Sequence, residues 1–371
     1  MIPVFDVILG KNAKKYVNEC LDSGWISEKG PFVDLFTLAF AQYLGTKYAL
    51  PTTSGTSALH LAVAAAGIGP GDEVIITAFT MISPVYAILY MGATPVFVDV
   101  EPDTWCMRVA DIEAKITKKT KAILAVHIYG NMVDMKPLLT LAKKYKLLVI
   151  EDAAEALGSE YSGKKMGTFG DIACFSFYAN KLVTTGEGGM VVTNDSYFYQ
   201  RLQMLKNMAH SPKKRFMHTE IAYTYRMTNL QAAIGMAQLE EVEGNLQKKR
   251  DIAHAYQKLL STIDSIQLPI QKPYTKNSYW IFGIVLSKKF GVKRDQLQKK
   301  LFKKGIDTRA FFVDMANQPV LQKMGILKRE TYPYADYISR NGCYLPSGFG
   351  ITKRDLKYIG QTIKQIHNEY L

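Results

Sequence analysis

Two acidic residues and one lysine have the chemistry and the positions needed to act on a carbonyl group. Glu151 and Asp152 end the apolar run LLVIED (147–152), and Lys181 follows Asp152 by 29 residues in FSFYANKLVTTGEGGM. Side chains at the carboxyl ends of parallel strands face the crevice in which open α/β sheets bind ligands, and we favour Asp152 as the functional acid. A lysine in a water-poor pocket loses its proton readily and forms a Schiff base with a carbonyl carbon. Taken alone, Lys181 is equally well interpreted as a surface lysine after a strand.

A candidate phosphate site lies at the start of the helix predicted after TSGTS (53–57). The free N–H groups of a helix N-terminus, its positive dipole end and the hydroxyls of Thr56 and Ser57 would receive a phosphate; an ordinary helix cap is the alternative. A phosphate cradle, an acid that pairs with a pyridinium nitrogen and a Schiff-base lysine are what pyridoxal 5′-phosphate (PLP) requires from a protein. Together these residues predict a PLP site.

Motifs for other chemistries are missing or incomplete. The glycines of GIGPG (67–71) follow a helix and do not open one, and GSEYSGKK (158–165) lacks the Ser/Thr that ends a P-loop. The six histidines form no H-E-x-x-H pair, and no serine lies in G-x-S-x-G. The four cysteines form no C-x-x-C pair, so we interpret them as buried apolar side chains. We expect neither a disulfide framework nor a metal site.

Six short apolar runs must position the candidate residues. They are VIIT (74–77), TPVFVDV (94–100), AILAVHIY (122–129), LLVIED (147–152), ACFSF (173–177) and MVVT (190–193). Such runs are typical of strands covered on both faces, and the early ones are separated by about 20 to 25 residues, enough for crossover helices. We therefore predict an α/β fold with a mostly parallel sheet wrapped by helices.

The pattern changes after Tyr225, where a long helical segment leads out of the sheet. The elements predicted beyond it are strands at 279–286 and 309–312, a basic helix at 294–304 and a closing helix at 353–367. These indicate a small α+β unit. The chain has 371 residues, and single cores stop growing at roughly 250 to 300 residues. We therefore predict two domains, with the PLP-binding large domain and N-terminal segment at 1–245 and the small domain at 246–371.

The composition, 48% hydrophobic and 21% charged, is that of a globular chain and excludes disorder as its main state. No apolar stretch approaches the roughly 18 residues of a membrane helix, and the first ten residues lack a basic n-region, so we expect a cytoplasmic protein without membrane contact. The net charge of +13 comes from short scattered clusters, with no basic stripe interleaved with aromatics. It would steer an anionic small substrate, and we expect no nucleic-acid partner.

Five segments resemble the DegT/DnrJ/EryC1/StrS family of nucleotide-sugar aminotransferases in wording and order. They are TTSGTSALHLAVAAAGIGPGDEVI, GATPVFVDVEP, TKAILAVHIYGNMVDM, IEDAAEALGSEYSGKKMGTFGDIACFSFYANKLVTTGEGGMVVTND and YTYRMTNLQAAIGMAQLE. The resemblance covers nearly the whole chain and implies the PLP-dependent transferase fold of type I. Within the family, the opening IPV, SGWISEKG (23–30) and RMTN (226–229) are most similar to members that convert GDP-4-keto-6-deoxymannose to GDP-perosamine.

The resemblance assigns roles to single residues. It makes Lys181 the lysine that carries PLP and moves the proton, Asp152 the partner of the pyridine nitrogen, and Glu155 a neighbour of the phenolic oxygen. The phosphate would be held by Gly55, Thr56, Ser57 and Ser176, with Asn229 reaching it from a neighbouring subunit. The active site would then be shared within a homodimer.

The resemblance also implies the reaction, in which an amino acid, expected to be glutamate, gives its amino group to a nucleotide-linked 4-keto-6-deoxyhexose for surface-polysaccharide synthesis. The substrate contacts expected are Trp25, Lys213, Arg215, His218, Arg309 and Phe311. The cluster that contains Lys213 and Arg215 would bind the diphosphate, although an exposed basic loop is an equal alternative.

Three positions depart from the family pattern. Met81 stands where an aromatic usually stacks on the PLP ring, and a methionine covers a ring face without π-stacking. Asp314 and Ala316 stand where relatives commonly carry Pro and His. We therefore expect the substrate contacts made by the small domain to differ.

Other functions remain open from the sequence. The substrate could instead be UDP- or dTDP-4-keto-6-deoxyglucose. A PLP-dependent sugar 3-dehydratase of this family would carry histidine in place of Lys181. A non-enzymatic regulator or nucleic-acid binder would need a helix-turn-helix or RNA-binding signature, which the sequence lacks.

Overall fold

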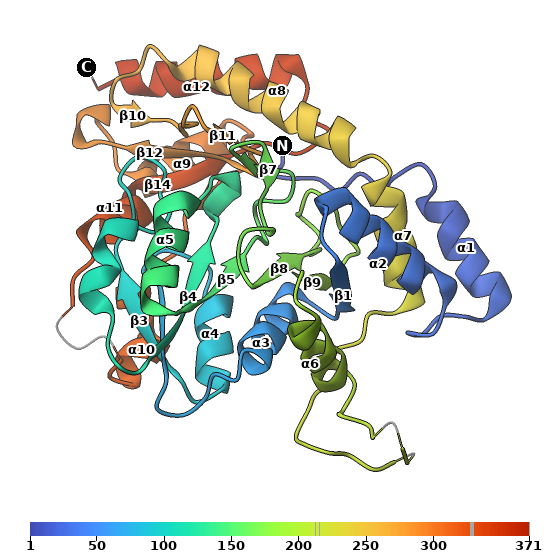
Figure 1. The fold of residues 1–371 in the computed structure, drawn as a ribbon. Helices are drawn as coiled ribbons and strands as arrows, with labels where there is room; N and C mark the ends of the chain where they lie inside the picture. The colour runs from blue at the N-terminus through green and yellow to red at the C-terminus, as the bar shows by residue number, and fades with distance from the viewer. Residues whose placement is uncertain (212, 215, 327–329, 371) are drawn as a thin grey trace.

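A seven-stranded sheet forms the centre of the molecule (Figure 1). The computed structural model describes residues 1–211, 213–214, 216–326 and 330–370. The strands, in their order across the sheet, are β1 Tyr48–Thr52, β9 Gly189–Thr193, β8 Ile172–Ser176, β5 Leu148–Asp152, β4 Thr120–Val126, β2 Glu73–Thr77 and β3 Thr94–Val98. Strands β8, β5, β4, β2 and β3 pair in parallel, and β9 runs antiparallel to β8 and β1. The six predicted strands and the α/β class are confirmed.

Strand β1 was not predicted from the sequence, because YALPT is short and contains Pro51. A proline cannot donate to a strand ladder and is tolerated at the edge of a sheet. Strand β1 lies at that edge, where it pairs with β9 alone.

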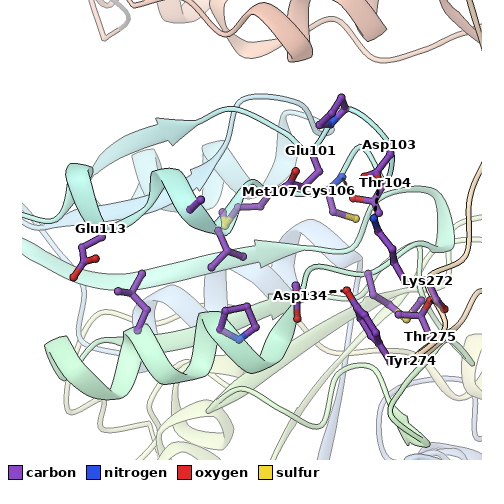
Figure 2. Close-up of a pocket in the computed structure, with 16 residues that line it drawn as sticks. Glu101, Asp103, Thr104, Cys106, Met107, Glu113, Asp134, Lys272, Tyr274 and Thr275 are labelled. Carbon is purple, nitrogen blue, oxygen red and sulfur yellow. Dashed lines mark hydrogen bonds and ion pairs between the residues drawn. The ribbon is translucent and has the colours of Figure 1, made fainter.

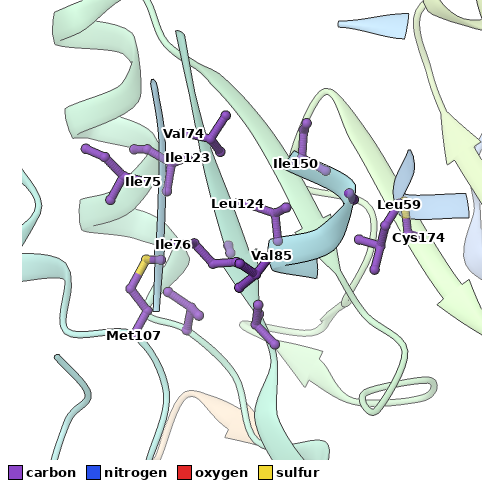
Figure 3. Close-up of a cluster of buried hydrophobic side chains, with 14 of the residues drawn as sticks. Leu59, Val74, Ile75, Ile76, Val85, Met107, Ile123, Leu124, Ile150 and Cys174 are labelled. Carbon is purple, nitrogen blue, oxygen red and sulfur yellow. The ribbon is translucent and has the colours of Figure 1, made fainter. Parts of the chain in front are cut away.

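Helices of the first 240 residues cover the sheet and its β1 edge. They are α1 Ala13–Ser23, α2 Pro31–Leu44, α3 Gly55–Ala65, α4 Ser83–Tyr90, α5 Met135–Tyr145, α6 Ser196–Lys206 and α7 Asn229–Leu239. Helix α3 is buried continuously from Ser57 to Ala65 because it packs on β5, β8 and β9 and also against α4 and α6. Figure 3 shows the core it helps to form, in which Leu59 of α3 and Val85 of α4 lie beside Leu124 and Ile150 of the sheet.

The C-terminal third forms a second, smaller sheet with its own helices. The sheet has the order β10 Ile266–Gln267, β12 Phe282–Leu286, β14 Gly342–Leu345 and β13 Arg309–Ala310. The helices of this part of the chain are α8 Val242–Leu260, α9 Arg294–Lys303, α10 Pro319–Lys323, α11 Pro333–Asn341 and α12 Lys353–Asn368, of which α10 lies near β3 of the large sheet (Figure 1). Strand β11 Thr275–Lys276 instead joins β6 Glu160–Tyr161 and β7 Lys164–Lys165 in a small sheet beside the large one.

The predicted boundary at 245/246 falls near the start of α8, which leads from α7 to the small sheet and packs against α12 (Figure 1). Tyr256 and Phe282 belong to a core around the small sheet, whereas Trp280 and Phe311 pack into the core of the large sheet. The C-terminal part therefore contributes side chains to the first core, and the division into two domains stays a prediction.

Candidate active site

A cavity of about 330 Å³ opens where strands β5 and β8 end and helix α3 begins. Seven of the predicted cofactor residues line it, namely Gly55, Thr56, Met81, Asp152, Glu155, Ser176 and Lys181. Trp280 and Phe312, from the C-terminal part of the chain, complete its wall. Folding therefore brings together the acid, the lysine and the helix N-terminus that the sequence singled out.

The two acids that end β5 have different surroundings because successive side chains of a strand point to opposite faces. Glu151 is fully buried and accepts hydrogen bonds from the backbone N–H groups of Gly167, Phe169 and Gly170 and from Nε2 of His127 at 3.1 Å. Burial raises the pKa of Glu151, but these hydrogen bonds outweigh it and leave the pKa below its ordinary value. Glu151 is thus stabilised in its ionised form, and its two oxygens already accept four hydrogen bonds.

Asp152 lines the cavity and has spare hydrogen-bonding capacity. Its Oδ1 accepts the N–H of Ala154 at 3.1 Å, the one hydrogen bond its side chain makes within the described chain. Burial raises the pKa of Asp152, opposed by the Ala154 hydrogen bond and by the charge of Lys181. A buried carboxylate with free acceptor positions is suited to a cationic N–H donor, as the protonated pyridine nitrogen of PLP would be.

Lys181 and Glu155 face each other across the cavity, with Nζ 3.9 Å from Oε1 and side chains that are 11% and 8% exposed. Burial lowers the pKa of Lys181, an effect that Glu155 opposes. Burial also raises the pKa of Glu155 to about 7, opposed by Lys181. An amine with a lowered pKa beside an acid with a raised pKa exchanges a proton more readily than the two free groups would, which is the property a catalytic lysine needs.

Tyr129 binds the carboxylate of Glu155 through its backbone, and the sequence did not predict this contact. Its N–H donates to Glu155 Oε2 at 2.8 Å. The run AILAVHIY was expected to be a strand throughout, but β4 ends at Val126, and Tyr129 has a φ of 55°, which is uncommon for a residue other than glycine. No local sequence signal marks this conformation, because the contacts of the Tyr129 ring come from distant residues, Trp280 among them.

The start of α3 has the free backbone N–H groups that the predicted phosphate site requires. Ser54 is the N-cap, and the Ser54 and Ser57 hydroxyls accept each other's backbone N–H at 3.1 and 2.9 Å, so Ser57 serves the cap and does not line the cavity. Among the described hydrogen bonds, none uses the N–H of Gly55 or Thr56. A Cβ at Gly55 would lie 2.8 Å from the Cβ of Ser176, so only glycine lets the helix N-terminus come this close to the end of β8. The cradle therefore fits a phosphate group.

The contact predicted between Asn229 and the phosphate in a neighbouring subunit stays a prediction. Within its own chain, the side chain of Asn229 is fully buried. Oδ1 accepts the N–H of Phe32 at 2.8 Å, and Nδ2 donates to the carbonyl of Trp25 at 2.6 Å and to Sγ of Cys20 at 3.1 Å. Within a single chain, Asn229 therefore holds the segment between α1 and α2.

The predicted substrate residues do not line the cavity within the single chain. Trp25 is exposed, and Lys213 and His218 lie on the hairpin that projects beyond α6 in Figure 1. Arg215 lies outside the described residues. Arg309 is exposed and pairs with Asp307 at 2.7 Å. These substrate contacts stay predictions.

Of the two aromatic residues in the segment RAFFVDMANQP, Phe312 lines the cavity, whereas Phe311 was predicted to contact the substrate. Phe311 is 3% exposed and packs on Trp105, whereas the adjacent Phe312 lines the cavity. Asp314 is buried and accepts the backbone and side-chain N–H groups of Asn317, so it closes a turn and does not line the cavity.

A second cavity, of about 600 Å³, lies between α5 and residues 272–275 (Figure 2). Two of its carboxylates are partnered, with Asp103 bound to Lys272 at 2.5 Å and Asp134 accepting from the hydroxyl of Tyr274 at 3.4 Å. Burial raises the pKa of the Cys106 thiol to about 12, so this cysteine is not a nucleophile. The cavity therefore lacks the combination of groups found around Lys181.

No group of three or more His, Cys, Asp or Glu side chains in the described residues could hold a metal ion. No helix in the same part of the chain is long and apolar enough to cross a membrane. The four cysteines are free and buried, as predicted.

Comparisons with known proteins identify the family. The model of the DegT/DnrJ/EryC1/StrS aminotransferase family matches residues 7–364. The GDP-perosamine synthase of Escherichia coli O157:H7 is 43% identical over 99% of both chains, and that of Vibrio cholerae is 42% identical over 99% of this chain and 100% of the relative. A putative sugar aminotransferase from Streptococcus pneumoniae, solved in its PLP form, superposes with a TM-score of 0.93 at 26% identity and covers 100% of this chain and 99% of its own. The chain therefore belongs to the DegT/DnrJ/EryC1/StrS aminotransferase family and is a PLP-dependent aminotransferase of fold type I.

Proposed function

We propose that this aminotransferase converts GDP-4-keto-6-deoxymannose to GDP-perosamine, with L-glutamate as the amino donor. The observation that carries the proposal is the identity of 40 to 43%, over 96 to 99% of this chain, with three GDP-perosamine synthases. The product would enter surface-polysaccharide synthesis, and the enzyme would work in the cytoplasm, where nucleotide sugars are made.

The cavity residues divide the work of amino transfer. PLP, when bound, supplies an electron-accepting ring that stabilises negative charge on the substrate carbon. Asp152 would keep the proton on the pyridine nitrogen. Nζ of Lys181 would take the proton from the Cα of the donor and pass it to the cofactor in the first half of the reaction, and would carry a proton from the cofactor to the accepting carbon of the sugar in the second half. The N–H groups of Gly55 and Thr56 hold the phosphate.

Water must be kept from the reacting atoms, and the wall of the cavity has suitable side chains. Met81, at the position where relatives carry an aromatic, lines the cavity and is 49% exposed. Trp280 and Phe312 line it as well, and both are contributed by the C-terminal part of the chain. Substrate binding over Met81 would cover its exposed surface and close the site to solvent.

We also propose a homodimer. The support is a set of large apolar side chains that the single chain leaves exposed, at Trp25, Leu35, Leu38 and Ile221. Exposed apolar surface of this kind marks association sites in soluble proteins. Analytical ultracentrifugation should give twice the chain mass, and a monomer at micromolar concentration would contradict this assembly.

The substrate is tested by offering GDP-, UDP- and dTDP-linked 4-keto-6-deoxy sugars with glutamate and analysing the products by mass spectrometry. We expect an amino-sugar product from the GDP-linked 4-keto-6-deoxymannose and none with Lys181→Ala. Preference for a UDP- or dTDP-linked sugar would replace the proposed substrate. A deoxy product without a new amino group would instead indicate the dehydratase.

A further inference from the structure

The indole ring of Trp280 lies against the ε-amino group of Lys181. Nζ of Lys181 is 3.6 Å from the centre of the ring, a distance typical of a cation held on an aromatic face. Trp280 is 7% exposed and belongs to the segment that precedes β12, so it reaches Lys181 only through the folded structure.

The same side chain also contacts the backbone next to the lysine. The indole N–H of Trp280 donates to the carbonyl oxygen of Asn180 at 2.8 Å. Trp280 therefore makes two different contacts with adjacent residues, one through its ring face and one through its N–H group. The ring face contacts the amine of Lys181, and the N–H group holds the backbone of the residue before Lys181.

Hydrogen bonds made by the residues just before Trp280 hold the segment that carries the indole. Ser278 donates its N–H to Ser159 Oγ at 3.0 Å, and Tyr279, with a φ of 49°, donates its N–H to Asn277 Oδ1 at 2.6 Å. Arg250 donates from Nε to the carbonyl of Asn277 at 3.1 Å. The segment 277–280 is thus held by the large sheet's loops and by α8, which leaves the indole little freedom.

We propose that Trp280 is a positioning residue for Lys181, whose amine it holds on its ring face toward Glu155 when that amine is not bonded to the cofactor. The proposal rests on the role proposed above for Lys181. An aromatic face attracts a cation and offers no such attraction to a neutral amine, so the ring favours the ammonium form against the effect of burial. The ring then adjusts both the place and the protonation of the group that moves the proton.

The test measures the protonation of Lys181 directly, without sugar substrate. Protein loaded with pyridoxamine 5′-phosphate leaves the lysine free, and its reaction with acetic anhydride across a pH series is followed by peptide mass spectrometry. Trp280→Leu removes the ring and the N–H, whereas Trp280→Phe keeps a ring. Trp105→Phe is the matched control, because Trp105 is also buried but does not line the cavity.

In Trp280→Leu the midpoint for Lys181 should fall by about one pH unit. Trp280→Phe should restore most of this fall, and Trp105→Phe should leave the midpoint unchanged. An unchanged or raised midpoint in Trp280→Leu would overturn the proposal, as would an equal fall in Trp105→Phe. If the leucine variant does not fold, Trp280→Met, whose unbranched and flexible side chain adapts to irregular space, is judged by the same criteria.

Melting temperatures of all variants separate this effect from a general loss of stability, which does not move the midpoint of one lysine. Borohydride trapping of wild-type protein loaded with PLP tests independently whether Lys181 carries the cofactor. A label at Lys181 with no effect of Trp280 would reject the positioning role alone. A label elsewhere would reject the role of Lys181 itself.

Discussion

Replacement of Asn229 by alanine distinguishes a residue that holds its own chain together from one that binds cofactor in a neighbouring subunit. The amide is fully buried at the first residue of α7. It joins α7 to the N–H of Phe32 and the carbonyl of Trp25, which lie on either side of the turn into α2. Alanine removes both of these bonds and the weaker one to Sγ of Cys20 but leaves the Thr228 cap of α7 in place.

The size of the effect follows from which groups lose their partners. A buried donor or acceptor left without a partner costs about 1 to 3 kcal/mol. The Phe32 N–H is in a buried bond and the Trp25 carbonyl in a partly buried one, so water can reach the carbonyl more easily. With about 2 kcal/mol for the first and about 1 for the second, we expect the free energy of unfolding to fall by about 3 kcal/mol.

The measurement is urea unfolding of cofactor-free protein, followed by fluorescence. Asn12→Ala is a matched control, since its amide also links the N-terminal region to the end of α7, through Glu240 at 2.7 Å, but in an exposed position. We expect a loss below about 1 kcal/mol for that exposed bond. Unchanged stability of Asn229→Ala, together with weakened PLP binding, would refute the structural role and restore the contact with a neighbouring subunit.

Three further substitutions test the charges around the site and α8. Lys181→Ala should abolish borohydride-trapped cofactor, and a label on another lysine in this variant would contradict the assignment. Because burial raises the pKa of Glu155 from 4.5 to about 7, its contribution to stability is present below about pH 4.5 and lost as the pH rises to about 7. The melting temperature of the wild type should therefore fall relative to Glu155→Gln across that interval, and parallel curves would exclude the effect. Burial lowers the pKa of Lys249 from 10.5 to about 8. The contribution of Lys249 to the free energy of unfolding is therefore lost as the pH falls through this interval. Lowering the pH from 10.5 to 8 should raise the free energy of unfolding of Lys249→Met relative to the wild type by about 3 kcal/mol. A constant difference in urea unfolding at the two pH values would refute that reasoning.

Sequence reasoning located the cavity because strand ends carry a strong local signal. The run LLVIED becomes β5, and its last residue, Asp152, faces the cavity as the topology requires. Lys181 follows β8 closely enough that the position of that strand nearly decides the position of the amine. Local sequence patterns therefore suffice where a functional side chain lies within a few residues of a buried strand.

The same reasoning missed contacts that depend on distant residues. The partners of Asn229 within its own chain, Phe32 and Trp25, lie about 200 residues away in the sequence, and no local pattern predicted them. Phe311 and Phe312 are adjacent aromatics, and only the register of β13 against β14 decides which of them enters the core. Neither pairing leaves a periodic signal in a single sequence.

Glu151 and Asp152 show why residue type alone cannot assign chemistry at this sheet edge. Both are carboxylates, both are buried, and they are neighbours, yet the loop after β7 supplies N–H donors to one and not to the other. A carboxylate with four donors gains nothing from a further cation, whereas one with a single donor still has free lone pairs. Exchange of the two roles would require both a new path for residues 167–170 and a strand shifted by one residue, which would turn every side chain of β5 to the opposite face. The acid at position 152 is therefore fixed by the register of the whole sheet, and a substitution that disturbs this register should impair cofactor binding without touching the cavity.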